Sequence, residues 1–297
     1  RNQAATTSTG GYGRSTMSAD GPAARVQSED FRNVYASGRA TDAIAQMDEI
    51  RGDPFFAALK ARSFELMRAS PGGRVLDAGC GAGDDVIALA RIVGPAGRAQ
   101  GLDFSSAMVA EARRRASASG IEAEFTVASV AAMPFENNAF DGIRCERTLQ
   151  HVEDIEASLR EMVRILRPGG SIVVIDADRG VSASDFPGWD GDIEERLARW
   201  RAASGPVRNG LISRQARRHL IGLGLEDVVA EPWVNTSAAE LERRPAIVDQ
   251  LHARAIAAGV ITAEEAANRS SALLAALGDG TLLMTTLFWV TSGTKPR

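Results

Sequence analysis

The sequence predicts an α/β protein in which short parallel strands alternate with helices along one open sheet. The first observation is an apolar strand pattern at residues 74–78, followed directly by a glycine-rich turn and by an apolar helix pattern at residues 86–93. The second is that strand-like and helix-like segments continue to alternate as far as residue 176. The third is the segment 171–176, SIVVID, which is almost wholly apolar, as a parallel strand buried on both faces should be.

Turn residues and hydrophobic periodicity place the other elements. Ser105 or Ser106 is expected to cap a helix that Gly120 ends, and Pro168 is expected to stop a helix that begins near residue 155. Strands are expected at residues 74–78, 98–103, 123–127, 140–145, 171–176, 226–234 and 281–291. The last two strands are expected to pair antiparallel, which gives a sheet of seven strands.

Segments that depart from this alternation divide the chain. Residues 1–28 are rich in Ser, Thr, Gly and Ala, which predicts a flexible arm or one packed on a partner, so a homo-oligomer formed through this arm stays open. Residues 29–70 are expected to form a helical lid. The core then occupies residues 71–297, with cap insertions at about 178–209 and 237–278.

Composition excludes several classes of function. The net charge of -4 argues against nucleic-acid binding, which usually requires a basic surface. No apolar run approaches the roughly 20 residues of a membrane span, so no membrane partner is expected. The two cysteines, Cys80 and Cys145, are expected to be free thiols in a reducing cytoplasm. The three histidines lie far apart, and no metal site is predicted.

The glycine turn indicates which ligand the sheet binds. Its spacing is G-x-G-x-G, and Asp84 stands where a dinucleotide fingerprint has its third glycine. Two carboxylates at the start of the following helix, Asp84 and Asp85, would repel a pyrophosphate. Asp103 ends the second strand, where an acidic residue accepts hydrogen bonds from ribose hydroxyls. A ligand with a ribose, no phosphate and a positive charge fits, and S-adenosylmethionine has all three properties.

Four motifs in order support this interpretation: VLDAGCGAG, GLDFS, AMPFENNAFDGI and HVEDIEASLREMVRILRPGGSIVVID. With them the chain resembles class I S-adenosylmethionine-dependent methyltransferases, clearly over residues 74–177, and is most similar to the ubiquinone/menaquinone-biosynthesis-like small-molecule group. The resemblance implies a Rossmann-like seven-strand sheet of order 3-2-1-4-5-7-6 with the last strand antiparallel. It also implies methyl transfer to oxygen, nitrogen or carbon of a small molecule such as a secondary metabolite or a quinone-like compound, with S-adenosylhomocysteine as product.

The resemblance also implies which residues bind the cofactor. The methionine part is expected to be lined by Asp77, Gly79, Cys80, Gly81 and Gly83, with Glu146 at the same group. Asp103 is expected to bind both ribose hydroxyls, with Phe104 and Met108 against the adenine. The family often has Gly-Asp-Ala after the third strand, whereas this chain has Ala128, Ser129 and Val130. The usual acid at the adenine amino group is therefore missing, and the Ser129 hydroxyl and the Val130 backbone are expected to replace it.

Few catalytic residues are required, because positioning the nucleophile supplies most of the rate. His151 is the candidate general base, at the carboxyl end of the fourth strand, although it can equally hold the loop. Tyr35 and, less so, Tyr12 are weaker candidates as phenolic bases or substrate contacts; packing explains either as well. Arg147 is a candidate partner of the cofactor carboxylate, of an acidic substrate or of a surface acid. Four aromatic residues, Phe186, Trp189, Trp200 and Trp233, either fill the core or line an apolar pocket.

Two other functions stay open. A nicotinamide-dependent oxidoreductase shares the fold but would need the missing third glycine. A non-catalytic cofactor-binding protein is favoured only by the altered segment at Ala128 and Ser129. Asp176 and Asp178 are too few acidic residues to bind a divalent ion without further ligands.

Overall fold

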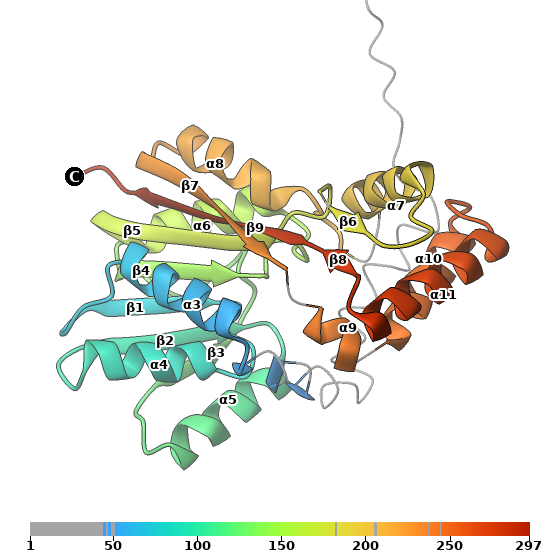
Figure 1. Ribbon diagram of the computed structural model, residues 1–297. Helices are drawn as coiled ribbons and strands as arrows, with labels where there is room; N and C mark the ends of the chain where they lie inside the picture. Colours follow the sequence, from blue (N-terminus) through green and yellow to red (C-terminus); the bar gives the residue numbers. More distant parts are fainter. Residues whose placement is uncertain are drawn as a thin grey trace, which may run out of the picture.

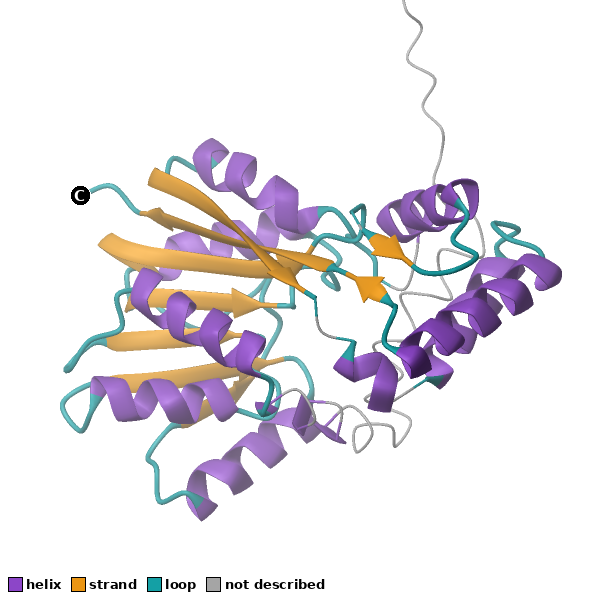
Figure 2. Cartoon of the chain, viewed as in Figure 1, coloured by secondary structure: helices purple, strands orange, loops and turns teal. Residues whose placement is uncertain are grey.

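The computed structural model describes residues 44–45, 47–48, 51–181, 183–204, 207–236, 238–243 and 245–297. The predicted N-terminal arm, Tyr12 and Tyr35 lie outside the described residues, as does most of the predicted lid before residue 51. The described chain forms a twisted sheet with helices on both faces and a group of helices beyond one end of the strands (Figures 1 and 2).

The main sheet has seven strands in the order β3-β2-β1-β4-β5-β9-β7. Its strands are β1 (Arg74–Ala78), β2 (Arg98–Asp103), β3 (Glu124–Val127), β4 (Phe140–Glu146), β5 (Leu166–Ala177), β7 (Glu226–Asn235) and β9 (Thr286–Thr294). β9 runs antiparallel to both of its neighbours, and the first five strands pair parallel. This confirms the predicted order, with the last strand of the chain inserted antiparallel between the fifth and sixth.

Alternate side chains of the strands enter two separate cores. One core contains Val75 and lies under α3 (Pro54–Leu66), α4 (Asp84–Val93) and α5 (Ser106–Ala118). The other contains Leu76 and lies under α6 (Ile155–Ile165) and α8 (Ile212–Gly222). Because neighbouring strand residues point to opposite faces, this division makes three layers, helix on sheet on helix.

Two boundaries differ from the sequence prediction. β5 starts at Leu166, directly after α6, because Leu166 pairs with Phe140 before a register shift in the ladder. The predicted last strand is divided into β8 (Leu283–Met284) and β9, and β8 pairs with the unpredicted β6 (Ser184–Asp185). Thr285 causes the division, because its hydroxyl bonds the backbone N–H and carbonyl of Ala183. Two-residue strands are too short to show an alternating pattern.

The two insertions pack together in one cap. α7 (Gly191–Ser204) comes from the first, and α9 (Ala239–Arg243), α10 (Ala246–Ala257) and α11 (Ala263–Asp279) come from the second. Two hydrophobic clusters contain residues of both insertions, and Arg269 of α11 pairs with Glu194 of α7. The cap adjoins the carboxyl end of β5, as Figure 1 shows. None of the described helices is both long and apolar enough to cross a membrane.

Most of the aromatic residues in question fill cores. Phe186 and Trp200 are buried in the two clusters of the cap. Trp233 packs on the α3 face, edge-on to Phe55. Trp189 differs, because 47% of its surface is exposed. The apolar-pocket alternative therefore has support at the exposed Trp189 and at Trp200, which lines a cavity of the cap.

Candidate functional site

The glycine turn is fastened across the carboxyl ends of β1 and β2. The backbone N–H groups of Gly79 and Cys80 both donate to the carbonyl of Leu102, at 2.7 and 2.9 Å. The next N–H, of Gly81, donates to Asp103 Oδ2 at 3.0 Å. These bonds hold the turn in one conformation beside the carboxylate predicted to bind ribose.

Gly79 also allows the turn to contact the loop after β4. Its φ of 84° lies in the left-handed region, and a Cβ there would lie 2.1 Å from Thr148 Oγ1. A side chain at this position would therefore be strained and would push the two loops apart. The close approach makes the loops after β1 and β4 parts of a single site at the carboxyl edge of the sheet, where open α/β sheets bind their ligands.

The carboxylate of Asp103 has capacity for a ligand. Its Oδ1 accepts from the Ser105 N–H at 2.9 Å and its Oδ2 from Gly81, and only 8% of the residue is exposed. A carboxylate offers about four acceptor positions, and because the Phe104 backbone also acts on Asp103, only part of them stays available for a ligand. Burial raises the pKa of Asp103, although the neighbouring backbone N–H groups act in the opposite direction. The backbone donors hold the Asp103 carboxylate in place, and its remaining lone pairs can accept hydrogen bonds from the hydroxyls of an adenosine ribose.

The residues predicted for the adenine lie at the carboxyl ends of β2 and β3. Phe104 is half exposed, whereas Met108 is fully buried in the first turn of α5. The Ser129 hydroxyl accepts from the Ala131 N–H at 3.2 Å, and Val130 is buried. The Ala128 N–H donates to the carbonyl of Asp103, which brings this loop beside the ribose carboxylate.

A buried arginine lies beneath the glycine turn. Arg144 of β4 is 1% exposed; its guanidinium donates to Asp77 Oδ1 at 3.0 Å and to Ser63 Oγ at 2.8 Å. It also bonds the Glu146 carboxylate and lies 3.0 Å from Asp85 Oδ2. Sequence reasoning missed Arg144, although an arginine placed between Ile143 and Cys145 in a buried strand was a detectable signal.

This cluster determines what Asp77 and Glu146 do. Burial raises the pKa of Asp77 to about 6, because repulsion from Asp85 and Glu146 adds to the desolvation and outweighs the attraction of Arg144. The Asp77 carboxyl thus bonds inward to Arg144 and orients the turn. Glu146 lies between Arg144 and Arg147, whose Nε is 3.1 Å from its Oε1.

The carboxylates that open α4 are compensated, which corrects one part of the sequence argument. Asp85 pairs with Lys60 at 2.8 Å and with Arg144. Asp84 pairs with Arg115 at 2.6 Å. Their charges are thus largely neutralised, so they would repel a pyrophosphate much less than two open carboxylates. The case against a dinucleotide therefore rests on the glycine spacing.

His151 follows β4 at the same edge of the sheet. Burial, with the charges of Arg179 and Arg147, lowers the pKa of His151 to about 3. The imidazole is therefore neutral at pH 7. It can accept a hydrogen bond, but it is a much weaker base than an ordinary histidine.

Asp176 and Asp178, at the end of β5, have different environments. Asp178 bonds Arg214 in a two-point pair, at 2.6 and 2.7 Å. Asp176 is fully buried, and neither of its carboxyl oxygens makes a hydrogen bond with the described residues. Burial raises its pKa well above the ordinary value, although Arg179 and the Gln150 backbone act against this. The two acids thus do not form a pair of open ligands.

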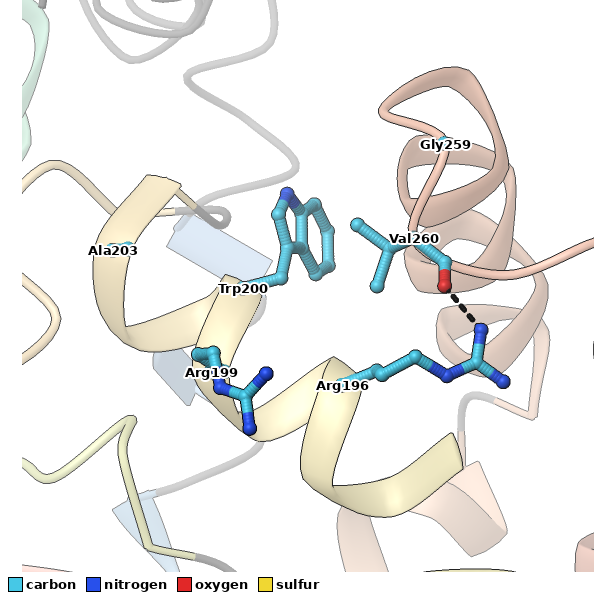
Figure 3. Close-up of a pocket in the computed structure, with 6 residues that line it drawn as sticks. All are labelled: Arg196, Arg199, Trp200, Ala203, Gly259 and Val260. Atoms are coloured by element: carbon cyan, nitrogen blue, oxygen red, sulfur yellow. Dashed lines mark hydrogen bonds between the residues drawn. The ribbon is translucent and has the colours of Figure 1, made fainter. Parts of the chain in front are cut away.

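A cavity of about 300 Å³ lies in the cap, away from the glycine turn. Figure 3 shows its lining, which comes from α7 and from the turn after α10. The lining residues are Arg196, Arg199, Trp200, Ala203, Gly259 and Val260. Arg196 closes one side with a hydrogen bond to the Val260 carbonyl. The cavity contains none of the residues predicted to bind cofactor.

We predict that Arg144→Met destabilises the protein by about 3–5 kcal/mol, because three buried carboxylates lose their shared cation. The control Arg160→Met removes an exposed pair with Glu156 on α6 and should change the free energy of unfolding by less than about 0.5 kcal/mol. Urea unfolding of both variants measures the difference. Equal stabilities of the two variants would contradict a structural role for Arg144.

We also predict a pH-dependent stability caused by His151. Its pKa is about 3 in the folded protein and near 6.5 when unfolded, so between these values the unfolded chain binds more protons. Stability is then fully present above pH 6.5 and falls as the pH drops, by up to about 2 kcal/mol at pH 5. Urea unfolding at several pH values should show a shallower decrease for His151→Gln than for the unchanged protein; identical slopes would exclude this cause.

Comparison with known proteins agrees with this geometry. The family described as a methyltransferase domain matches residues 69–219, half of the chain. A demethylmenaquinone methyltransferase of Bacillus cytotoxicus is 35% identical over 154 residues, which cover 52% of this chain and 65% of that protein. An uncharacterized 37.1 kDa protein of transposon TN4556 from Streptomyces fradiae is 35% identical over 185 residues, 62% of this chain and 52% of that protein. The chain thus matches between half and two thirds of the length of these relatives.

Solved structures share the fold. The [4+2]-cyclase SpnF superposes with a TM-score of 0.52 at 23% identity, covering 80% of each chain. The YcgJ protein of Bacillus subtilis gives a TM-score of 0.54 at 20% identity, covering 80% of this chain and 98% of that one. At these identities the likeness shows the fold alone. Together with the family match over half the chain, it shows that this protein belongs to the S-adenosylmethionine-dependent methyltransferase domain family.

Proposed function

We propose that this protein transfers a methyl group from S-adenosylmethionine to oxygen, nitrogen or carbon of a small molecule. The observation that carries the proposal is the Asp103 carboxylate, which is bonded to the glycine turn at Gly81 and keeps acceptor capacity for ribose hydroxyls. A hydride-transfer enzyme is disfavoured, because its dinucleotide would need the third glycine where Asp84 stands.

The other cofactor contacts extend from this point. The methionine part would lie along Gly79, Cys80, Gly81 and Gly83, with Asp77 holding the turn from below and Glu146 at its far end. The adenine would lie on the exposed ring of Phe104, with Met108 supporting that surface from beneath. The Val130 backbone is proposed to meet the adenine amino group, together with the Ser129 hydroxyl, which already accepts one bond from Ala131.

Positioning is the main contribution of the chain to the reaction. When bound, the cofactor supplies an electrophilic methyl group on its sulfonium. The loops after β1 and β4 would hold the acceptor in line with that methyl group, an effect worth several kcal/mol of the barrier. His151, being neutral, would accept a hydrogen bond from the acceptor. A strong base is then unnecessary only if the acceptor atom is already deprotonated when it attacks the methyl group.

The class of acceptor follows from the cap and from the relatives. The cap adjoins the carboxyl end of β5, and within the cap Trp189 exposes an apolar ring, which suits a small organic molecule such as a secondary metabolite or a quinone-like compound. The relatives named demethylmenaquinone methyltransferase are consistent with a quinone-like acceptor. Cys80 and Cys145 are both free thiols, as expected for a reducing cytoplasm.

Labelled cofactor provides the test of function. We expect transfer of the labelled methyl group from S-adenosylmethionine to at least one compound of a panel of phenols, quinols, amines and carboxylic acids, with S-adenosylhomocysteine as product. Tight NADH binding without binding of S-adenosylhomocysteine would favour an oxidoreductase instead. Binding of S-adenosylhomocysteine with no methyl transfer to any compound would favour a protein that uses the cofactor without methylating, and the fold is shared by a protein named as a cyclase.

We predict that Asp103→Ala weakens binding of S-adenosylhomocysteine by a factor of about 100 or more, because two charge-assisted hydrogen bonds to the ribose are lost. Asp185→Asn is the control, since Asp185 is an exposed acid of β6 in the cap. Isothermal titration of both variants measures the effect. An unchanged affinity of the Asp103 variant would disprove the ribose assignment.

A further inference from the structure

Two arginines meet at the boundary between the sheet and the cap. The Arg179 N–H, in the loop after β5, donates to the carbonyl of Gly210 at 2.9 Å. Gly210 in turn lies directly against the backbone of α7, since a Cβ on it would be 2.6 Å from the Arg201 carbonyl oxygen. The fold therefore brings Arg179 and the last turn of α7 to the same place.

Two nitrogens of the half-buried Arg201 lack an acceptor there. Its Nε and Nη2 atoms are inaccessible to solvent and make no hydrogen bond with any part of the chain that the structure describes. Leaving a buried guanidinium unsatisfied costs free energy, more than for a neutral group. Such groups are rare in folded proteins, and a missing ligand is one of the standard reasons for them.

Two of the neighbouring carboxylates are already engaged in ion pairs with other arginines. Glu194 is the acid whose charge favours the protonated form of Arg201, but it already forms a two-point pair with Arg269. Asp178 is held by Arg214 in the same way. Burial and the charges of Arg269 and Arg179 lower the pKa of Arg201 to about 10, which still leaves it charged at neutral pH. No carboxylate of the described chain forms a direct ion pair with Arg201, although Glu194 favours its charge and the unbonded Asp176 favours that of Arg179.

This charge lies on the acceptor side of the site. The Arg179 guanidinium donates to Gln150 Oε1 at 3.4 Å, and its charge acts on His151 and on Asp176. These residues follow β4 and β5, whereas the ribose carboxylate and the glycine turn belong to β1 and β2. Arg179 therefore lies farther along the carboxyl edge of the sheet, beyond the loop after β4, than the predicted ribose and adenine contacts.

We propose that Arg201 and Arg179 bind an anionic group of the methyl acceptor, a carboxylate or a phosphate. This inference rests on the proposed function and deepens it, since it gives the acceptor a charge. A guanidinium presents a planar set of N–H donors that matches two oxygens of either group. The anion would satisfy the buried Nε and Nη2 of Arg201 and anchor the acceptor at the boundary of the cap.

The test uses the full chain saturated with S-adenosylhomocysteine. Thermal unfolding is followed against increasing benzoate in one arm and inorganic phosphate in the other, at constant ionic strength with chloride as the reference anion. We expect at least one of the two anions to raise Tm saturably, and the arm that responds identifies the group. Arg201→Met should weaken that response at least tenfold, and Arg201→Lys less, because lysine keeps the charge without the planar set of donors.

Arg199→Met is the matched control, two residues earlier on α7, where Arg199 is exposed and pairs with Glu195. It should respond as the unchanged protein does. Affinity for S-adenosylhomocysteine, measured first in each variant, shows that the fold is retained; if Arg201→Met does not fold, Arg201→Lys and Arg179→Gln replace it. Suppose that the unchanged protein binds S-adenosylhomocysteine but its Tm does not rise saturably with either anion, or that the Tm of the Arg201 variant rises equally. Either result overturns the anion site alone. Failure of the unchanged protein to bind S-adenosylhomocysteine overturns the proposed function instead.

Discussion

The site depends on one buried guanidinium. Arg144 of β4 connects to β1 through Asp77, to α4 through Asp85 and to α3 through Ser63, so the two elements that flank the glycine turn, β1 and α4, bond to the same side chain. Such a cluster gives little net stability, since desolvation offsets much of the attraction. Its value is geometric, because four polar groups can be satisfied together only when these elements hold one arrangement.

The sequence predicted those parts of the structure that local patterns encode. The glycine turn at residues 79–83, Asp103 and the alternation of apolar segments predicted where the strands lie. The family resemblance predicted the order of the strands in the sheet. The ion pairs of Asp84 and Asp85 were not predictable, because Arg115 and Arg144 lie far away along the chain. Chain order also does not show that two separate insertions pack as one cap. The places of Met108 and His151 along the chain follow from the sequence. The burial of Met108 and the lowered pKa of His151 do not, because both depend on residues from other parts of the chain.

The electrostatics of the site favour one kind of chemistry. Acidic groups near the glycine turn are compensated by Arg144 and Lys60, whereas two nitrogens of Arg201 at the cap boundary lack an acceptor in the described chain. His151, between these regions, is neutral because burial and two arginines disfavour its cation. A site of this kind suits an acceptor that already carries negative charge, held by arginines, and relies on positioning more than on proton transfer.

A crystal structure of the complex with S-adenosylhomocysteine tests the central claim most directly. The account predicts that both ribose hydroxyls lie within hydrogen-bond distance of the Asp103 carboxylate, with the methionine part along the glycine turn and the sulfur directed toward the loop after β4. Density for the nucleoside at another place, for instance in the cap cavity beside Trp200, would contradict it.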